Sequence, residues 1–262
     1  MTATDFIEKK NRGEPISMVT SYDSWSAALV AASDVDVILV GDSAAMVMHG
    51  HASTIPADLP MMAAHVAAVR RGADDAFVVA DMPFLSFRGS IDAVIDAVGV
   101  LMQAGANAVK LEGAEGNLDT VARIVGSGVP VMGHLGLTPQ SVNAFGGFRV
   151  QGRSNEAAAR LARDAAALEE AGCFSVVLEA VPAATAETVS RSLTIPTIGI
   201  GAGCGTDGQV LVLQDLLGLQ PEFKPRFVRR FLDGASLITD ALNAYHQEVV
   251  SRRFPSDKEA YS

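Results

Sequence analysis

The chain has 262 residues, of which 49% are hydrophobic and 6% aromatic, so we expect a core built mainly from Val, Ile, Leu, Ala and Met. Its formal net charge of −10 argues against nucleic acid as a partner, because no basic stripe compensates it. The apolar runs are too short to span a bilayer, and residues 1–14 lack the apolar region of a secretory signal. These features predict a soluble, cytoplasmic, globular protein.

Eight apolar, strand-like runs alternate with helix-like segments along the chain. Ser90 is placed to cap a helix that begins at Ile91, and Ser154 to cap a helix over residues 155–171. Strands are expected at Ser17–Ser21, Val35–Val40, Ala76–Ala80, Ala108–Leu111, Val129–Gly133, Phe174–Leu178, Thr197–Gly201 and Val210–Leu213. Eight strands, most of them followed by a helix, are typical of a (β/α)₈ TIM barrel.

An open, doubly wound sheet is the alternative to the barrel. Such a sheet usually has fewer strands and a glycine-rich first turn, whereas the first strand here runs into Thr20–Asp23 without a glycine. The barrel is therefore the predicted fold, with a short extra helix over residues 1–12. No linker-like segment interrupts the pattern, so residues 1–262 are predicted to form a single barrel domain.

Four carboxylates stand at the ends of predicted strands, namely Asp42, Asp81, Glu112 and Glu179. A single acid in such a place is commonly a helix cap or a solvated loop residue. Four at equivalent strand ends should meet at one face of a barrel, where they repel one another unless a cation or a proton intervenes. Because the donors are hard oxygens, Mg²⁺ is the favoured ion. We expect Asp42 and Asp81 to bind it directly, and Glu112 directly or through a water.

Other polar residues accompany these acids. Lys110 lies two residues before Glu112 and so shares its face of the strand, where it either points inward to bind a substrate anion or snorkels at the barrel end. Ser43 either contacts an anionic ligand or caps a helix. His134 is either a substrate-binding pocket residue or a core histidine. Glu179, which follows an apolar run, is the candidate general base.

Long blocks of the sequence resemble ketopantoate hydroxymethyltransferases (3-methyl-2-oxobutanoate hydroxymethyltransferases). The resemblance extends over approximately Ile16 to Leu219. Its blocks lie at Thr20–Asp23, Val40–Ser43, Gly50–Thr54, Ala67–Ala73, Ala80–Phe84, Ala104–Gly113, Gly133–Gly147, Val150–Arg153 and Ile195–Gln209. Blocks of this length and order are specific to the family.

The resemblance implies a role for each candidate residue and a pair of substrates. The family's metal-binding acids match Asp42, Asp81 and Glu112; its keto-acid contacts match Asp42, Ser43, Asp81 and Lys110; and its proton acceptor matches Glu179. The implied cofactor is one Mg²⁺ per subunit, and the implied co-substrate is 5,10-methylenetetrahydrofolate. The implied reaction converts 3-methyl-2-oxobutanoate into 2-dehydropantoate in pantothenate biosynthesis, within a homo-oligomer that the family builds as a decamer.

Two other functions share part of this pattern. One is a Mg²⁺-dependent oxo-acid lyase or mutase of the isocitrate lyase type, but neither Cys173 nor Cys204 lies in the Lys-Lys-Cys-Gly-His block of the isocitrate lyases. The other is a barrel without catalysis that serves as a scaffold. A scaffold has no need for four mutually repelling acids, so the transferase is the favoured function.

Overall fold

The computed structural model of the chain describes residues 1–147 and 149–261. The chain divides into two compact units, Met1–Val212 and Leu213–Ser262. Every strand of the barrel lies in the first unit, whereas the second contains the helices α10 and α11. The inclusion of residues 213–262 in a single barrel domain stays a prediction.

The first unit is a closed barrel of eight parallel strands, which confirms the predicted (β/α)₈ fold. Each strand pairs with the next along the chain, and β8 closes the barrel on β1. The strands are β1 Ile16–Thr20, β2 Val37–Val40, β3 Phe77–Asp81, β4 Ala108–Glu112, β5 Val131–Gly136, β6 Ser175–Glu179, β7 Thr197–Ile200 and β8 Gly208–Leu211. Every predicted strand overlaps an observed one.

The helices follow the strands and are started by polar caps. The side chains of Asp23, Asp58, Ser90 and Ser154 each accept a backbone hydrogen bond in the first turn, as predicted for the two serines. The helical elements are α1 Ala3–Arg12, α2 Ser24–Ala31, α3 Ala44–Val47, α4 Leu59–Gly72, α5 Ile91–Gln103, α6 Leu118–Gly126, η1 Pro139–Ser141, α7 Val142–Phe145, α8 Asn155–Glu170, α9 Ala183–Ser192, α10 Leu213–Leu216 and α11 Gly234–Val250. None of these helices, within the residues described, is both long and apolar enough to span a bilayer.

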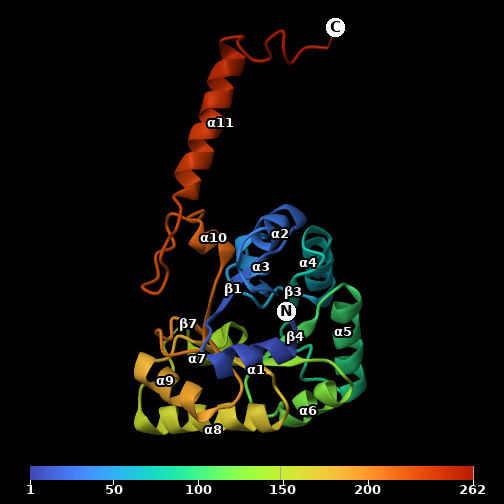
Figure 1. Cartoon of the computed structure of the whole chain (residues 1–262), viewed down its shortest axis with the longest axis vertical. Helices are drawn as coiled ribbons and strands as arrows, with labels where there is room; N and C mark the ends of the chain where they lie inside the picture. The colour runs from blue at the N-terminus through green and yellow to red at the C-terminus, as the bar shows by residue number, and fades with distance from the viewer. Residues whose placement is uncertain (148, 262) are drawn as a thin grey trace. The chain divides into compact units, whose positions relative to one another are not determined.

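The predicted N-terminal extra helix is α1, and it fills one end of the barrel. Figure 1 shows α1, in dark blue, inside the ring of helices that surrounds the strands. A capping box between Thr2 and Asp5 starts the helix. Phe6 is fully buried, with its ring centroid 4.9 Å from that of Phe174 and 5.6 Å from that of Phe77. The helix therefore contributes an aromatic plug to the barrel core.

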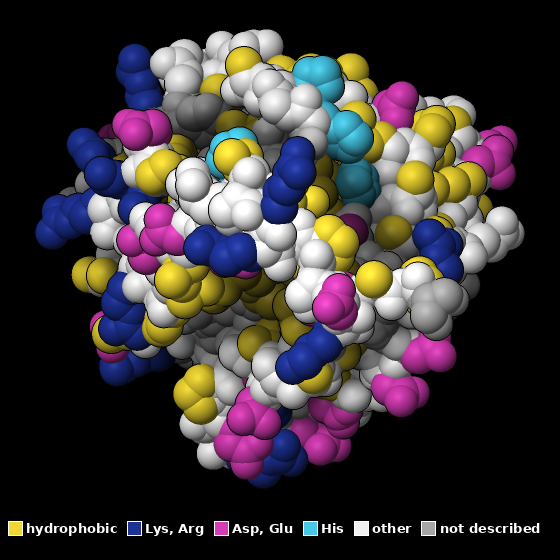
Figure 2. All heavy atoms as spheres, turned by 90° about the horizontal axis from the view of Figure 1, so that it is seen from above, with side chains coloured by type: hydrophobic (Ala, Val, Ile, Leu, Met, Phe, Trp, Pro, Cys, Tyr) yellow, Lys and Arg dark blue, Asp and Glu magenta, His cyan; other side chains and the backbone are white. Residues whose placement is uncertain are grey.

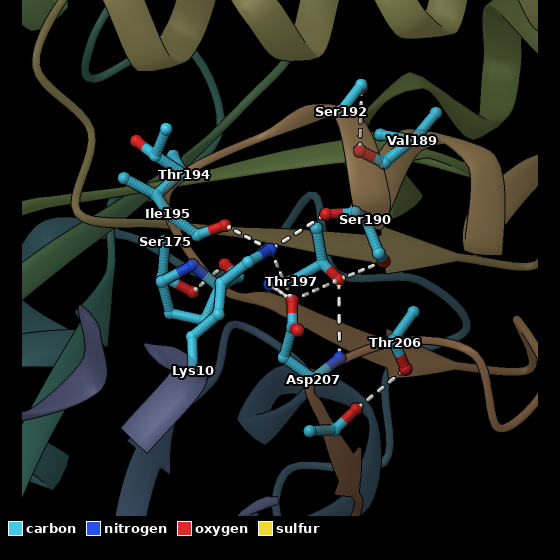
Figure 3. Close-up of polar contacts among 12 residues, drawn as sticks. Lys10, Ser175, Val189, Ser190, Ser192, Thr194, Ile195, Thr197, Thr206 and Asp207 are labelled. Carbon is cyan, nitrogen blue, oxygen red and sulfur yellow. Dashed lines mark hydrogen bonds and ion pairs between the residues drawn. The ribbon is translucent and has the colours of Figure 1, made fainter. Parts of the chain in front are cut away.

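A polar network fixes α1 to the beginnings of β7 and β8 (Figure 3). The ammonium group of Lys10 donates hydrogen bonds to the carbonyl oxygens of Ser190 (2.7 Å) and Ile195 (3.0 Å), and it pairs with Asp207 at 2.9 Å. Asp207 also accepts a hydrogen bond from the backbone N–H of Thr197, the first residue of β7 (2.8 Å). The N-terminal end of the barrel is thus closed by structural contacts, which leaves the C-terminal end for a site.

Strand register brings the sequence-predicted residues together at that C-terminal end. Asp81 lies opposite Lys110, Glu112 lies opposite His134, and Gly136 lies opposite Glu179. On the molecular surface, acidic and basic side chains are interspersed over the face shown in Figure 2, with apolar side chains between them.

Candidate active site

Asp42 and Asp81 lie next to each other at the ends of β2 and β3. Both are buried, and the backbone N–H of Asp42 donates to Asp81 Oδ2 at 3.0 Å. Gly41 permits this approach: a Cβ there would lie 2.8 Å from Ser43 Oγ and 3.5 Å from Asp81 Oδ2. Burial raises the pKa of Asp42 well above its usual range, and the charges of Asp81 and Glu112 raise it further.

Lys110 supplies a buried positive charge beside these acids. Its ammonium group forms an ion pair with Asp81 Oδ1 at 2.8 Å, and only 4% of the residue is exposed. Burial by itself lowers the pKa of Lys110, but the negative charges of Asp81, Glu112 and Asp42 outweigh it and raise that pKa above its usual value. Lys110 therefore points into the barrel as an ammonium ion, and the snorkelling alternative is wrong.

Glu112 ends β4 and is held from two sides. Its Oε2 accepts a hydrogen bond from the backbone N–H of Gln140 at 3.0 Å, and its Oε1 lies 3.4 Å from His134 Nδ1. Its backbone carbonyl accepts from the side chain of the fully buried Asn117 at 3.0 Å. These contacts fix the carboxylate near Lys110 and His134.

His134 connects Glu112 to Glu179. Its Nδ1 lies 3.2 Å from Lys110 Nζ, and its Nε2 lies 3.2 Å from Glu179 Oε2. Burial and the charge of Lys110 lower the pKa of His134, but contacts with the two glutamates raise it to about 9. When Nδ1 accepts from Lys110, or when the ring carries both protons, a proton sits on Nε2 and faces Glu179. His134 thus belongs to the polar cluster rather than to an apolar core.

Ser43 is placed by a tyrosine that the sequence reasoning did not assign. Ser43 lies at the start of α3, where its side chain makes no capping hydrogen bond. Its Oγ instead lies 2.8 Å from the hydroxyl of Tyr22, a residue that is 1% exposed. Burial raises the pKa of this tyrosine, so the hydroxyl keeps its proton. The helix-cap alternative for Ser43 is therefore wrong.

The donor set suits a hard divalent cation, although the side chains do not form a ready-made cage. Within the described part of the chain, no three His, Cys, Asp or Glu side chains stand together as a preformed ligand group. The backbone N–H of Asp42 nevertheless donates a hydrogen bond to the carboxylate of Asp81. Gln140 donates hydrogen bonds to the carboxylates of both Asp42 and Glu112. Buried oxygen donors with an excess of negative charge fit Mg²⁺, which commonly uses one or two carboxylates and keeps several waters.

Comparison with known sequences identifies the family. The sequence model of the ketopantoate hydroxymethyltransferases matches residues 1–257. The chain belongs to this family. A ketopantoate hydroxymethyltransferase relative, the 3-methyl-2-oxobutanoate hydroxymethyltransferase of Bdellovibrio bacteriovorus, is 58% identical over 100% of this chain and 99% of its own length. The corresponding protein of Coxiella burnetii is 54% identical over 97% of this chain and 96% of its own.

Solved structures with the same fold include more distant barrels. A phosphonopyruvate hydrolase, crystallised as a complex with oxalate and Mg²⁺, matches with a TM-score of 0.61 over 100% of this chain and 92% of its own. Its sequence identity is 14%, so the likeness shows the fold alone. The structural likeness thus supports the barrel fold and no particular activity, whereas the sequence match shows the ketopantoate hydroxymethyltransferase family.

Proposed function

We propose that this chain transfers a hydroxymethyl group from 5,10-methylenetetrahydrofolate to 3-methyl-2-oxobutanoate, giving 2-dehydropantoate and tetrahydrofolate in pantothenate biosynthesis. The observation that carries the proposal is the buried cluster of Asp42, Asp81, Lys110 and Glu112 in a member of this family. These side chains come from neighbouring strands and meet at the barrel end where such enzymes bind substrate.

The balance of charge explains how an anionic keto acid binds among carboxylates. Four acids surround the site, and Lys110 already forms an ion pair with one of them. Without a metal, protons offset part of this charge, because the pKa values of Asp42 and His134 are both raised. A keto acid that binds beside an ionised Asp42 adds a further negative charge, which an additional cation compensates. We therefore assign the carboxylate of the substrate to Lys110 and Ser43, with His134 beside it.

The additional cation in this proposal is one Mg²⁺ per subunit. Asp42 and Asp81 would hold it, with Glu112 acting directly or through a water. When bound, Mg²⁺ supplies Lewis-acid stabilisation of negative charge that develops on the keto oxygen. The Mg²⁺ and oxalate in the phosphonopyruvate hydrolase complex, a protein of the same fold, support this choice of ion.

Glu179 is the proposed proton acceptor because its side chain is more accessible to solvent than those of Asp81 and Glu112. Its side chain is 18% exposed, compared with 5% for Asp81 and 4% for Glu112. His134 Nε2 lies 3.2 Å from Glu179 Oε2, and we assign the other carboxylate oxygen to the substrate. Glu179 then removes the C3 proton of the keto acid, and the resulting enolate attacks the one-carbon unit of the folate; with one water, the products are 2-dehydropantoate and tetrahydrofolate.

An assay with both substrates tests this function. Incubation with 3-methyl-2-oxobutanoate, methylenetetrahydrofolate and Mg²⁺ should release tetrahydrofolate and 2-dehydropantoate in equal amounts. A lyase or mutase of the isocitrate lyase type would instead convert an oxo acid without folate, and a scaffold would convert neither. Failure to form tetrahydrofolate with correctly folded, metal-loaded protein would overturn the transferase assignment.

We further propose that the chain assembles into a homo-oligomer, the decamer expected from the resemblance. The support lies in α11, which exposes a series of large apolar side chains: Leu237, Ile238, Leu242, Tyr245, Val249 and Val250. Exposed apolar surface of this extent is typical of protein interfaces. The cytoplasmic location predicted from the sequence stays a prediction.

A further inference from the structure

One residue outside the predicted site, Gln140, contacts three of the strand ends that build it. Gln140 lies in η1, after β5, and is 5% exposed. Its side-chain amide donates to Asp42 Oδ2 at 2.8 Å and to the carbonyl oxygen of Met82 at 3.0 Å. Its backbone N–H donates to Glu112 Oε2 at 3.0 Å. A single residue therefore connects the ends of β2, β3 and β4.

The hydrogen-bond partners define how the amide of Gln140 is oriented. A carboxylate oxygen and a carbonyl oxygen only accept, so the group that faces Asp42 and Met82 must be the NH₂, and both of its hydrogens are used. The other end of the amide, Oε1, is buried and has no hydrogen-bond partner. A buried acceptor without a donor costs about 1–3 kcal/mol, so this oxygen suits a donor that arrives with the ligand.

The side chain of Gln140 is uncharged, and this affects how it can act on Asp42. Asp81 already has Lys110 as a charged partner, whereas Asp42 has the amide of Gln140. A second lysine at this place would neutralise Asp42 and compete with a bound cation. An amide holds one carboxylate oxygen and leaves the charge of the group in place.

We propose that Gln140 is a positioning residue of the metal site. It holds Asp42 through Oδ2, so that Oδ1 of that carboxylate turns toward the cation, and it fixes Glu112 through Oε2, while the other oxygen of Glu112 lies 3.4 Å from His134 Nδ1. The Oε1 atom of Gln140 accepts a hydrogen bond from a water in the shell of that cation. This inference rests on the metal site of the proposed function. Groups that orient metal ligands in this way typically change metal affinity by about 10–100-fold when they are removed.

Binding of Mn²⁺ to the full-length chain, followed through the EPR signal of the free ion, tests the proposal without any measurement of activity. The variant is Gln140→Met, which keeps the size of the side chain and the backbone N–H but removes the amide. Its matched control is Gln209→Met, because the Gln209 amide makes two hydrogen bonds of similar length, to the Gly203 carbonyl (2.9 Å) and to Thr206 Oγ1 (2.8 Å), and neither acceptor is a carboxylate. Asp81→Ala gives the scale for a lost ligand.

We expect Gln140→Met to raise the Mn²⁺ dissociation constant about 10–100-fold, and Gln209→Met to change it less than twofold. An unchanged constant in Gln140→Met, with a lowered melting temperature, would show that Gln140 is only a structural residue and would overturn the inference. If the unmodified chain binds no Mn²⁺, the proposed metal site itself fails, which is a distinct result.

A crystal structure of the unmodified chain with Mn²⁺ gives a second test if Gln140→Met does not fold. We expect the Gln140 amide to remain within hydrogen-bond distance of Asp42 Oδ2 while Asp42 Oδ1 faces the ion. An amide turned away from Asp42 in that complex would contradict the proposal.

Discussion

At the scale of single residues, the acids of the site divide by their neighbours. Asp81 is paired with an ammonium group, and Asp42 and Glu112 are held by Gln140. Glu179 has His134 Nε2 beside it, and its side chain is more exposed than those of Asp81 and Glu112. A carboxylate that must take up and release a proton needs such access, whereas a metal ligand benefits from being fixed.

Glu179→Gln should abolish proton abstraction and spare binding. We expect exchange of the C3 proton of 3-methyl-2-oxobutanoate in D₂O to slow by about 10²–10⁴-fold, the usual contribution of a general base. Metal-dependent binding of the keto acid should stay within a few-fold of the unmodified chain, because the amide preserves the shape of the side chain. NMR measures the exchange and calorimetry the binding. Loss of keto-acid binding would instead make Glu179 a ligand.

The raised pKa of His134 predicts how the stability of the metal-free chain depends on pH. The pKa of His134 is about 9 in the folded protein, against the ordinary value of 6.5 in the unfolded chain. A raised pKa contributes stability that is fully present below pH 6.5 and is lost as the pH rises through 9. The shift corresponds to at most about 3 kcal/mol.

Denaturant unfolding at pH 6, 8 and 10 measures this contribution. The free energy of unfolding of the unmodified chain should fall over this range relative to that of His134→Gln, which lacks the titrating ring. The test is how the difference in unfolding free energy between the two proteins changes with pH. Its value at any single pH also contains the effect of the substitution on packing. Parallel pH profiles would show that His134 does not gain a proton on folding.

The sequence predicted the charged members of the site but not the neutral residues that hold them. Acids at strand ends and a lysine within a strand stand out because burial penalises charge. Gln140, Tyr22 and Asn117 lie in turns and at helix starts, where polar residues are usually solvated, so their burial depends on how distant loops fold over the barrel end. No local pattern distinguishes them from ordinary surface residues.

At the scale of elements, the contact between the ends of β5 and β6 determines where Glu179, the proposed proton acceptor, lies. Gly136 ends β5 with φ of +91°, and a Cβ on it would lie 2.3 Å from the carbonyl oxygen of Glu179. The same carbonyl accepts a hydrogen bond from the backbone N–H of Leu137 at 2.8 Å. Ala180, directly after Glu179, has φ of +49°, a conformation that L-residues rarely adopt. The backbone around Glu179 is therefore tightly specified.

Gly136→Ala tests the importance of this close approach. The added Cβ should push the end of β5 from Glu179 and lower kcat by at least tenfold, since displacements of about 1 Å can cost about 100-fold. Gly146→Ala is the control, because Gly146 also has a positive φ (+65°) but has nothing within 4 Å of the added Cβ. Both variants place an alanine at a positive φ, but only Gly136→Ala brings a Cβ against the Glu179 carbonyl. Steady-state kinetics and thermal unfolding of the two variants therefore separate the effect of this steric clash from that of the backbone strain. Equal kcat values would contradict the role of Gly136.

Lys10→Met should affect stability without affecting catalysis. The substitution removes three partners of Lys10 and leaves Asp207 without its ion pair, so we expect a loss of about 2–3 kcal/mol in unfolding free energy. Because the network lies at the N-terminal end of the barrel, kcat should not change. Arg12→Met on the same helix removes only exposed ion pairs and should leave the free energy of unfolding almost unchanged. A drop in kcat for Lys10→Met would show coupling between the barrel ends.

Element positions were predictable to within a few residues, and the errors have physical causes. The fifth strand begins at Val131 rather than Val129, because Pro130 lacks the N–H that a ladder hydrogen bond requires. It also continues to Gly136, beyond the predicted Gly133, since pairing with β6 extends that far. An apolar run marks where a strand is buried, whereas the ends of the strand depend on its partner strands.

At the scale of the whole molecule, the number and order of strands were enough to predict a closed barrel. The proposed homo-oligomer is a separate matter, because it would depend on surfaces such as the exposed apolar side chains of α11. Sedimentation velocity of the chain should show a species near ten times its 27.3 kDa mass. Leu242→Glu, which places a charge on that helix, should shift the distribution toward smaller species. A monomer in the unmodified chain would overturn the proposed oligomer.

The anchoring of α1 has a consequence for the way the chain folds during synthesis. Lys10 leaves the ribosome early, but its partners Ser190, Ile195 and Asp207 lie 180 to 197 residues later in the sequence. The plug of the barrel must therefore wait, solvated or loosely associated, until nearly all of the strands have emerged. Contacts of such long sequence separation slow folding, so docking of the first helix should be among the last events in forming the native state.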